Sequence, residues 1–106
     1  DARIILVAYG SVARIAQSVV RRLRKKGKKI GLIRPVSLWP FPDKIFKRLL
    51  ANGKRLTFLV IEMSLGQMVE DVELAVRGRA AVKFFGRAGG GIPSEEEIIH
   101  KLHKVA

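Results

Sequence analysis

Residues 3–23, RIILVAYGSVARIAQSVVRRL, predict a β-strand that leads directly into an α-helix. The stretch from Arg3 to Tyr9 is apolar after its first residue and rich in β-branched side chains, which is typical of a strand buried on both faces of a parallel sheet. Gly10 interrupts this run, and Ser11 is a suitable N-cap for the following helix. Apolar residues then recur at helical spacing, and Gly27 is a typical residue to end the helix.

The same strand–helix unit recurs three more times along the chain. We expect further strands over residues 29–34, 55–62 and 80–85, and further helices over residues 42–50, 64–78 and 94–105. Regular alternation with short connections favours a three-layer α/β/α fold with an open, mostly parallel sheet. With right-handed crossovers, the four strands are predicted to lie in the order 2-1-3-4. The chain, residues 1–106, is predicted to be one domain.

Local signals place the ends and faces of the later helices. Ser64 with Gln67, and Ser94 with Glu97, have the spacing of a capping box, which marks a helix N-terminus. The helix over residues 42–50 is expected to bury one apolar face, formed by Ile45, Phe46, Leu49 and Leu50.

The composition excludes several kinds of site. The chain has 106 residues and no cysteine, so it holds no disulfide, no thiolate metal site and no cysteine-ligated iron–sulfur cluster. It also lacks a run of the roughly 20 apolar residues that cross a bilayer, and we expect a cytoplasmic protein that does not bind membranes. The chain begins with Asp1 rather than Met, and we expect it to be a fragment of a longer subunit.

The net charge of +12 is concentrated in the first half of the chain. Residues 1–55 contain fifteen Lys and Arg against two Asp and Glu, whereas residues 56–106 contain six against seven. One interpretation is a surface that attracts an acidic partner; the other is an ordinary solvated surface. We define the basic face as the residues in and after the first helix: Arg21, Arg22, Arg24, Lys25, Lys26, Lys28 and Lys29.

Candidate catalytic groups are few, and we predict no catalytic, cofactor-binding or metal-binding residue in this chain. His100 and His103 lie three residues apart on the last helix, off its apolar face, with no third ligand in view. Ser11 follows a strand as a nucleophile elbow does, but the second glycine of that motif is missing. The glycine-rich segment 86–93 lacks a P-loop ending, and three interpretations stay open for it: an interface, a tight turn or an anion site.

Three stretches together resemble one enzyme family: RPVSLWPFP at residues 34–42, VIEMSLGQMVED at residues 60–71 and FFGRAGGGIP at residues 84–93. Their order and spacing are similar to the transketolase C-terminal-like domain, domain II, of 2-oxoacid:ferredoxin oxidoreductase α subunits. The 2-oxoisovalerate and 2-oxoglutarate types match best. Ser64 departs from the asparagine expected there, although serine also caps a helix.

The resemblance implies a part of an enzyme that oxidatively decarboxylates a 2-oxoacid to an acyl-CoA. It implies thiamine diphosphate, Mg, an iron–sulfur cluster and CoA in the whole complex, none of them held by this chain. The implied partners are other domains of the same subunit and a thiamine-binding β subunit, with ferredoxin as a further candidate. The implied role of this domain is structural, and the isolated chain is expected to be inactive.

Two alternatives remain at this point. One is a stand-alone basic Rossmann-like module for nucleic acid or a nucleotide, although the chain lacks the aromatic residues and motifs of nucleic-acid readers. The other is the equivalent domain of a transketolase or of a 2-oxoacid dehydrogenase E1 β subunit.

The predicted topology brings three loops to one edge of the sheet, at residues 10–12, 63–67 and 86–92. In open α/β folds this carboxyl edge carries the contacts. Glycines in these loops suit close packing against another domain. We therefore predict an interface formed by Ser11, Glu62, Ser64, Gly66, Gln67, Arg87, Gly89, Gly90 and Gly91.

Overall fold

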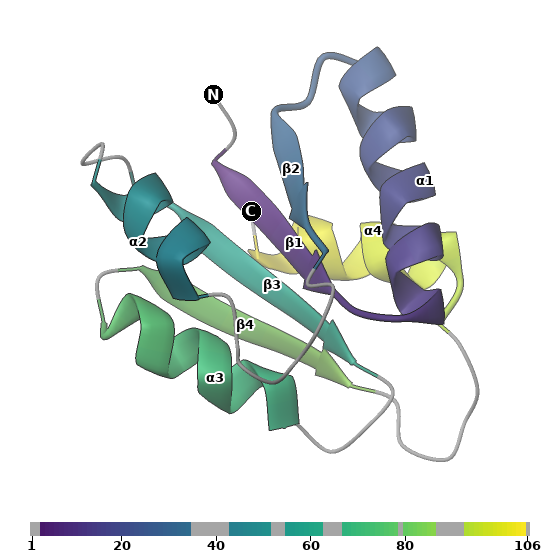
Figure 1. Ribbon diagram of the computed structural model, residues 1–106. Helices are drawn as coiled ribbons and strands as arrows, with labels where there is room; N and C mark the ends of the chain where they lie inside the picture. Colours follow the sequence, from purple (N-terminus) through teal and green to yellow (C-terminus); the bar gives the residue numbers. More distant parts are fainter. Residues whose placement is uncertain are drawn as a thin grey trace.

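The computed structural model describes residues 3–34, 43–51, 55–62, 67–78, 80–86 and 93–105. Strands and helices alternate along the chain, as the sequence predicts (Figure 1). The elements are β1 (Ile4–Ala8), α1 (Ser11–Lys25), β2 (Ile30–Ile33), α2 (Asp43–Leu50), β3 (Thr57–Glu62), α3 (Gln67–Val76), β4 (Ala81–Gly86) and α4 (Glu95–Val105).

The four strands form one parallel sheet in the order β2-β1-β3-β4, which confirms the predicted topology. β1 lies in the middle, with Ile4 opposite Ile30 of β2 and Thr57 of β3. All four arrows point the same way in Figure 1. Each of α1, α2 and α3 therefore returns the chain to the opposite end of the sheet, where the next strand begins.

Two helices cover each face of the sheet, so the three-layer prediction is also confirmed. In β1, Leu6 and Ala8 pack against α1 and α4, whereas Ile5 and Val7 pack on the side of α2 and α3. The alternation follows from the two-residue period of a strand. Because β1 has helices on both sides, its residues from 5 to 8 are all buried, which explains the continuous apolar run in the sequence.

The start of α1 differs from the prediction. Gly10, not Ser11, is the N-cap residue, and Ser11 is the first residue of the helix. Gly10 has φ 70° and ψ −142°, and its carbonyl accepts the N–H of Ala13 at 3.0 Å. This backbone conformation is almost restricted to glycine, so the turn after β1 requires Gly10 and places the N-cap one residue before Ser11.

The end of α1 is as predicted. Gly27 has φ 84°, its N–H donates to Arg24, and the N–H of Lys28 donates to Leu23 at 2.9 Å. These two bonds form the Schellman motif that satisfies the last carbonyls of a helix.

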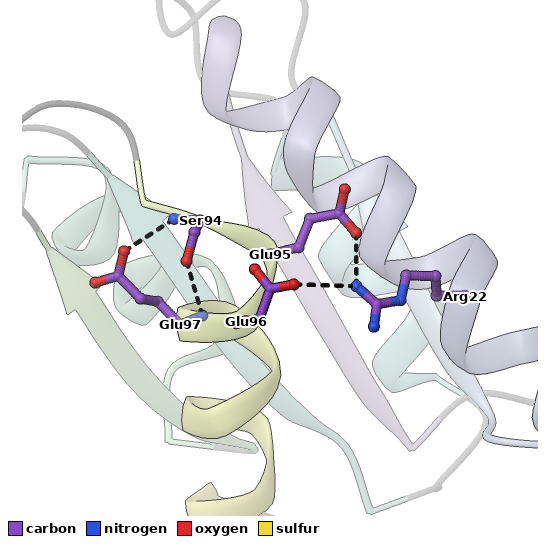
Figure 2. Close-up of polar contacts among 5 residues, drawn as sticks. All are labelled: Arg22, Ser94, Glu95, Glu96 and Glu97. Atoms are coloured by element: carbon purple, nitrogen blue, oxygen red, sulfur yellow. Dashed lines mark hydrogen bonds and ion pairs between the residues drawn. The ribbon is translucent and has the colours of Figure 1, made fainter.

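The capping box at the start of α4 is confirmed (Figure 2). The N–H of Ser94 donates to Oε1 of Glu97 at 3.0 Å, and the N–H of Glu97 donates to Oγ of Ser94 at 3.2 Å. The other predicted box depends on Ser64, which lies outside the described residues.

The apolar face predicted for α2 is only partly correct. Phe46 and Leu50 are buried, and the ring of Phe46 packs on Phe58 of β3 with 5.2 Å between the ring centres. Leu49 is partly buried, but Ile45 is 40% exposed, so its predicted burial is wrong. Residues 46 and 50, one turn apart, face the sheet, and Ile45 is rotated about 100° away from that line.

Candidate functional site

The carboxyl ends of β1, β3 and β4 lie at one level of the sheet. Ala8 pairs with Ile61, and Glu62 pairs with Gly86. The turn at Gly10, the end of β3 and the end of β4 therefore share one edge, as the topology predicts. We call this the carboxyl edge.

Glu62 at this edge is turned toward the first turn of α3. Its residue is only 8% exposed, and Oε1 accepts the N–H of Met68 at 2.8 Å while Oε2 accepts the N–H of Val69 at 3.0 Å. These N–H groups belong to the first turn of the helix, where no carbonyl of the same helix can reach them. The carboxylate also places negative charge at the positive end of the helix dipole. Glu62 thus fixes the start of α3 to the end of β3.

Glu62 is also one of the residues predicted to contact a neighbour. Both of its carboxylate oxygens bind within the domain, so Glu62 positions α3 at the carboxyl edge. Its contact with a neighbour stays a prediction. Of the other candidates in this segment, Ser64 and Gly66 lie outside the described residues, and Gln67 begins α3.

Two aromatic residues at the carboxyl edge were missed by the sequence analysis. Tyr9 follows the end of β1 and is 44% exposed, and Phe84 near the end of β4 is 36% exposed. Gly86 lies beneath the Phe84 ring, because a Cβ built at Gly86 would overlap that ring. The signal in the sequence is the position of Tyr9 next to Gly10, where the strand ends, although the predicted strand includes Tyr9.

Of the remaining interface candidates, Ser11 alone lies among the described residues. Ser11 opens α1 at this edge, immediately after Gly10. Arg87, Gly89, Gly90 and Gly91 lie outside the described residues, so the three interpretations of the glycine-rich segment stay predictions.

The basic face is exposed at all seven of its side chains. Two of them nevertheless make contacts within the domain. Nη1 of Arg22 lies 3.1 Å from Oε1 of Glu95 and 3.6 Å from Oε1 of Glu96, which connects α1 to α4 (Figure 2). The hydrogen bond to Glu95 raises the pKa of Arg22. Nε of Arg24 donates to the carbonyl of Ile30 at 2.7 Å, at the start of β2.

The histidines lie as predicted, with His100 and His103 both exposed on α4. Among the described residues, no three His, Asp or Glu side chains come together as a metal site would require. In the same part of the chain, no helix is both long and apolar enough to cross a membrane.

The sequence is similar to subunits of enzymes that act on 2-oxoacids. The ketoisovalerate oxidoreductase subunit VorB of Methanothermobacter marburgensis is 42% identical over 106 residues, which is 100% of this chain and 29% of that relative. The 2-oxoglutarate synthase subunit KorA of Methanocaldococcus jannaschii is 38% identical over 98 residues, which is 92% of this chain and 26% of the relative. The chain therefore spans less than a third of these relatives.

The fold has a counterpart among solved structures. A 2-oxoglutarate:ferredoxin oxidoreductase from Magnetococcus marinus, solved with 2-oxoglutarate, coenzyme A and succinyl-CoA bound, matches with a TM-score of 0.77 and 20% identity. The match covers 98% of this chain and 18% of that chain, and it concerns the fold. The sequence profile described as "Pyruvate:ferredoxin oxidoreductase core domain II" matches residues 2–98, nearly the whole chain. The chain therefore belongs to the pyruvate:ferredoxin oxidoreductase core domain II family.

Proposed function

We propose that this domain is a non-catalytic assembly domain of a thiamine-diphosphate-dependent 2-oxoacid:ferredoxin oxidoreductase. Its carboxyl edge packs against other domains of its subunit and a thiamine-binding β subunit. The observation that carries the proposal is the exposure of Tyr9 and Phe84, at 44% and 36%, on the same edge of the sheet. Large aromatic side chains are enriched at protein interfaces, where they bury apolar area with few rotatable bonds.

The chemistry of the proposed complex belongs to other parts of it. Thiamine diphosphate with Mg supplies the decarboxylation, an iron–sulfur cluster carries electrons, and CoA accepts the acyl group. A cysteine-ligated cluster does not fit this chain, which has no cysteine. The described residues also present no paired acid and base at the carboxyl edge, since Glu62 binds the first turn of α3. The proposed contribution of this chain is to hold the neighbouring domains in position and to provide a surface on which they pack.

The test compares two exposed apolar residues in the whole enzyme. Tyr9→Ser removes an aromatic side chain at the carboxyl edge, and Leu74→Ser removes an apolar side chain that is 71% exposed on α3. Neither change opens a buried core, so domain stability should change little. We expect Tyr9→Ser to weaken subunit assembly measured by sedimentation velocity, and Leu74→Ser to leave it unchanged. Equal assembly of both variants would contradict the proposal.

Hydrogen exchange gives an independent measurement on the segment that holds the other candidates. We expect the amides of residues 86–92 to be better protected in the whole enzyme than in this chain alone, because a packed neighbour excludes water. Arg87→Ala is expected to reduce assembly or activity more than domain stability. Equal protection in both samples would assign the glycine-rich segment to a turn and remove it from the interface.

We propose as a second function that the basic face attracts an acidic partner, with ferredoxin as the candidate. The supporting observation is that Lys25, Lys26, Lys28 and Lys29 are exposed together at the end of α1 and the start of β2. The electrostatic field of these lysines would mainly raise the association rate with an acidic partner, and this effect weakens as the salt concentration rises.

The test of the basic face reverses the charge of Lys25 and Lys26 to glutamate in the whole enzyme. Arg22 is left intact, because its reversal would also break the contact with Glu95 on α4. At low salt, electron transfer to ferredoxin should be slower in this variant than in the unmodified enzyme. At high salt, the two rates should become equal. An unchanged rate at low salt would leave these lysines as ordinary solvated residues.

A further inference from the structure

A small pocket opens at the end of the sheet opposite the carboxyl edge. It lies where α1 and α4 end and where β1 and β2 begin, and its volume is about 200 Å³. Roughly 150 Å³ of apolar cavity is enough for a benzene ring, whereas pockets for whole cofactors or drug-sized ligands measure about 300–1,000 Å³. The pocket therefore has room for one side chain and is too small for a nucleotide.

The inner wall of the pocket is apolar, formed by Ile4, Leu23, Ile30 and Leu102. Leu23, Ile30 and Leu102 are nearly buried, at 6%, 6% and 2% exposure. The rim is polar and exposed, formed by Arg3, Lys28, Lys29 and His103. An apolar base flanked by three cationic residues, Arg3, Lys28 and Lys29, suits a ligand with an apolar centre and anionic flanks.

Backbone hydrogen bonds hold this rim in place. The N–H of Arg3 donates to the carbonyl of Lys29 at 3.3 Å, so the starts of β1 and β2 lie side by side. The N–H of Lys28 donates to Leu23 at 2.9 Å within the Schellman motif of α1. The backbones that carry the three cations are therefore ordered before any partner arrives, which reduces the entropy lost on binding.

The positive charge of the rim is not neutralised within the described part of the chain. Arg3, Lys28 and Lys29 form no ion pair with a described carboxylate. The acidic side chains described by the structure lie on α3, at the end of β3 or in the first turn of α4.

The helix dipole explains only one residue of the rim. It favours basic residues in the last turn of a helix, which accounts for His103 on α4. Arg3, Lys28 and Lys29 lie outside the helices, so the dipole gives no reason for them.

We propose that this pocket anchors an acidic segment of a partner protein through one apolar side chain. That side chain enters between Ile4, Leu23, Ile30 and Leu102, and neighbouring carboxylates of the segment meet the rim cations. The inference rests on the proposed function of the basic face and deepens it, because it names the feature the partner must carry. A merely acidic partner would need the lysines alone, whereas this one needs the pocket as well.

The test is a methyl NMR titration of the 106-residue chain with three blocked hexapeptides. EELFEE carries both features, EESSEE keeps the charge without the apolar pair, and QQLFQQ keeps the apolar pair without the charge. We expect EELFEE to shift the methyl signals of Ile4, Leu23, Ile30 and Leu102 in a saturable way. The other two peptides should bind at least about tenfold more weakly, as expected for losing one buried side chain or the paired charges.

Two double variants with the same change of net charge locate the binding site. Lys28→Glu with Lys29→Glu reverses the rim, and Lys44→Glu with Arg48→Glu reverses two exposed cations on α2, across the sheet. Affinity for EELFEE should fall about tenfold or more in the first variant and less than about twofold in the second. Equal losses in both variants would show that only the overall field matters and would overturn the pocket proposal.

The peptide series separates failure of this inference from failure of the basic-face function. Equal binding of EELFEE and EESSEE would refute the pocket and keep an electrostatic basic face. Binding of neither acidic peptide would contradict both. Tighter binding of a short oligothymidine than of EELFEE, with shifts at the same methyl groups, would overturn the acidic-protein assignment in favour of a nucleic acid. Far-UV circular dichroism of each variant confirms that it is folded before its affinity is compared.

Discussion

Replacing Glu62 with glutamine is expected to destabilise the domain by about 2–3 kcal/mol. The carboxylate accepts two backbone N–H groups at 2.8 and 3.0 Å. Hydrogen bonds to a charged acceptor contribute about 1.5–3 kcal/mol each, against about 1 kcal/mol for neutral pairs. Glutamine keeps one oxygen, which makes one neutral bond, and turns an NH2 group toward the other N–H. One charged bond is lost and the other is weakened.

The change is measured by urea unfolding followed by circular dichroism. With a slope of about 1–3 kcal/mol per molar urea, typical of small proteins, the midpoint should fall by about 0.7–3 M with the slope unchanged. Hydrogen exchange adds local evidence. Of the amides of Met68 and Val69, one loses its acceptor and the other keeps a weaker one, so both should exchange faster.

Glu70→Gln is the matched control for Glu62→Gln. Glu70 is exposed in the first turn of α3, so its replacement removes a charge near the same helix end without removing these two bonds. A first-turn charge contributes about 0.3–1 kcal/mol. If Glu62→Gln shifts the midpoint no more than Glu70→Gln, the two hydrogen bonds do not stabilise the start of α3, and the reasoning is refuted.

Three further changes test local features by the same urea assay. Ser94→Ala removes the capping box and should cost about 1 kcal/mol, whereas Ser18→Ala inside α1 should cost nothing measurable or stabilise slightly. Gly27→Ala should cost about 1–2 kcal/mol, because φ is 84° there while the space around a Cβ is open; no loss would mean that the backbone turn relaxes. Gly86→Ala should cost about 1 kcal/mol by displacing the Phe84 ring, and this cost should disappear in a Phe84→Ala background. Persistence of the cost there would assign it to the backbone.

Element types, order and topology were predictable because they depend on local periodicity. The apolar run of β1 and the helical spacing in α1 each reflect burial within a single element. Four such units joined by short connections leave few arrangements, and the right-handed crossover rule selects β2-β1-β3-β4 among them. The capping box at Ser94 and the glycine at residue 27 were also predictable, since their hydrogen bonds join neighbours in the sequence.

The exact ends and faces of the elements were less predictable, because competing local signals give similar patterns. Ser11 has a good capping side chain, but the φ of 70° at Gly10 places the cap one residue earlier. Ile45 is as apolar as Phe46, and only the direction in which α2 lies on the sheet buries one and exposes the other. Tyr9 continues the apolar run of β1 yet lies beyond its last residue, at the exposed edge.

The family and the α/β framework of this protein can be identified from the amino-acid order alone, since apolar periodicity and three motifs point to both. The contacts of the charged residues depend on the tertiary structure. Glu62 binds the first turn of α3, and Arg22 of α1 pairs with Glu95 of α4, 73 residues further along the chain. Such contacts have no periodicity along the chain, and they exist only once the sheet and the helices around it are assembled.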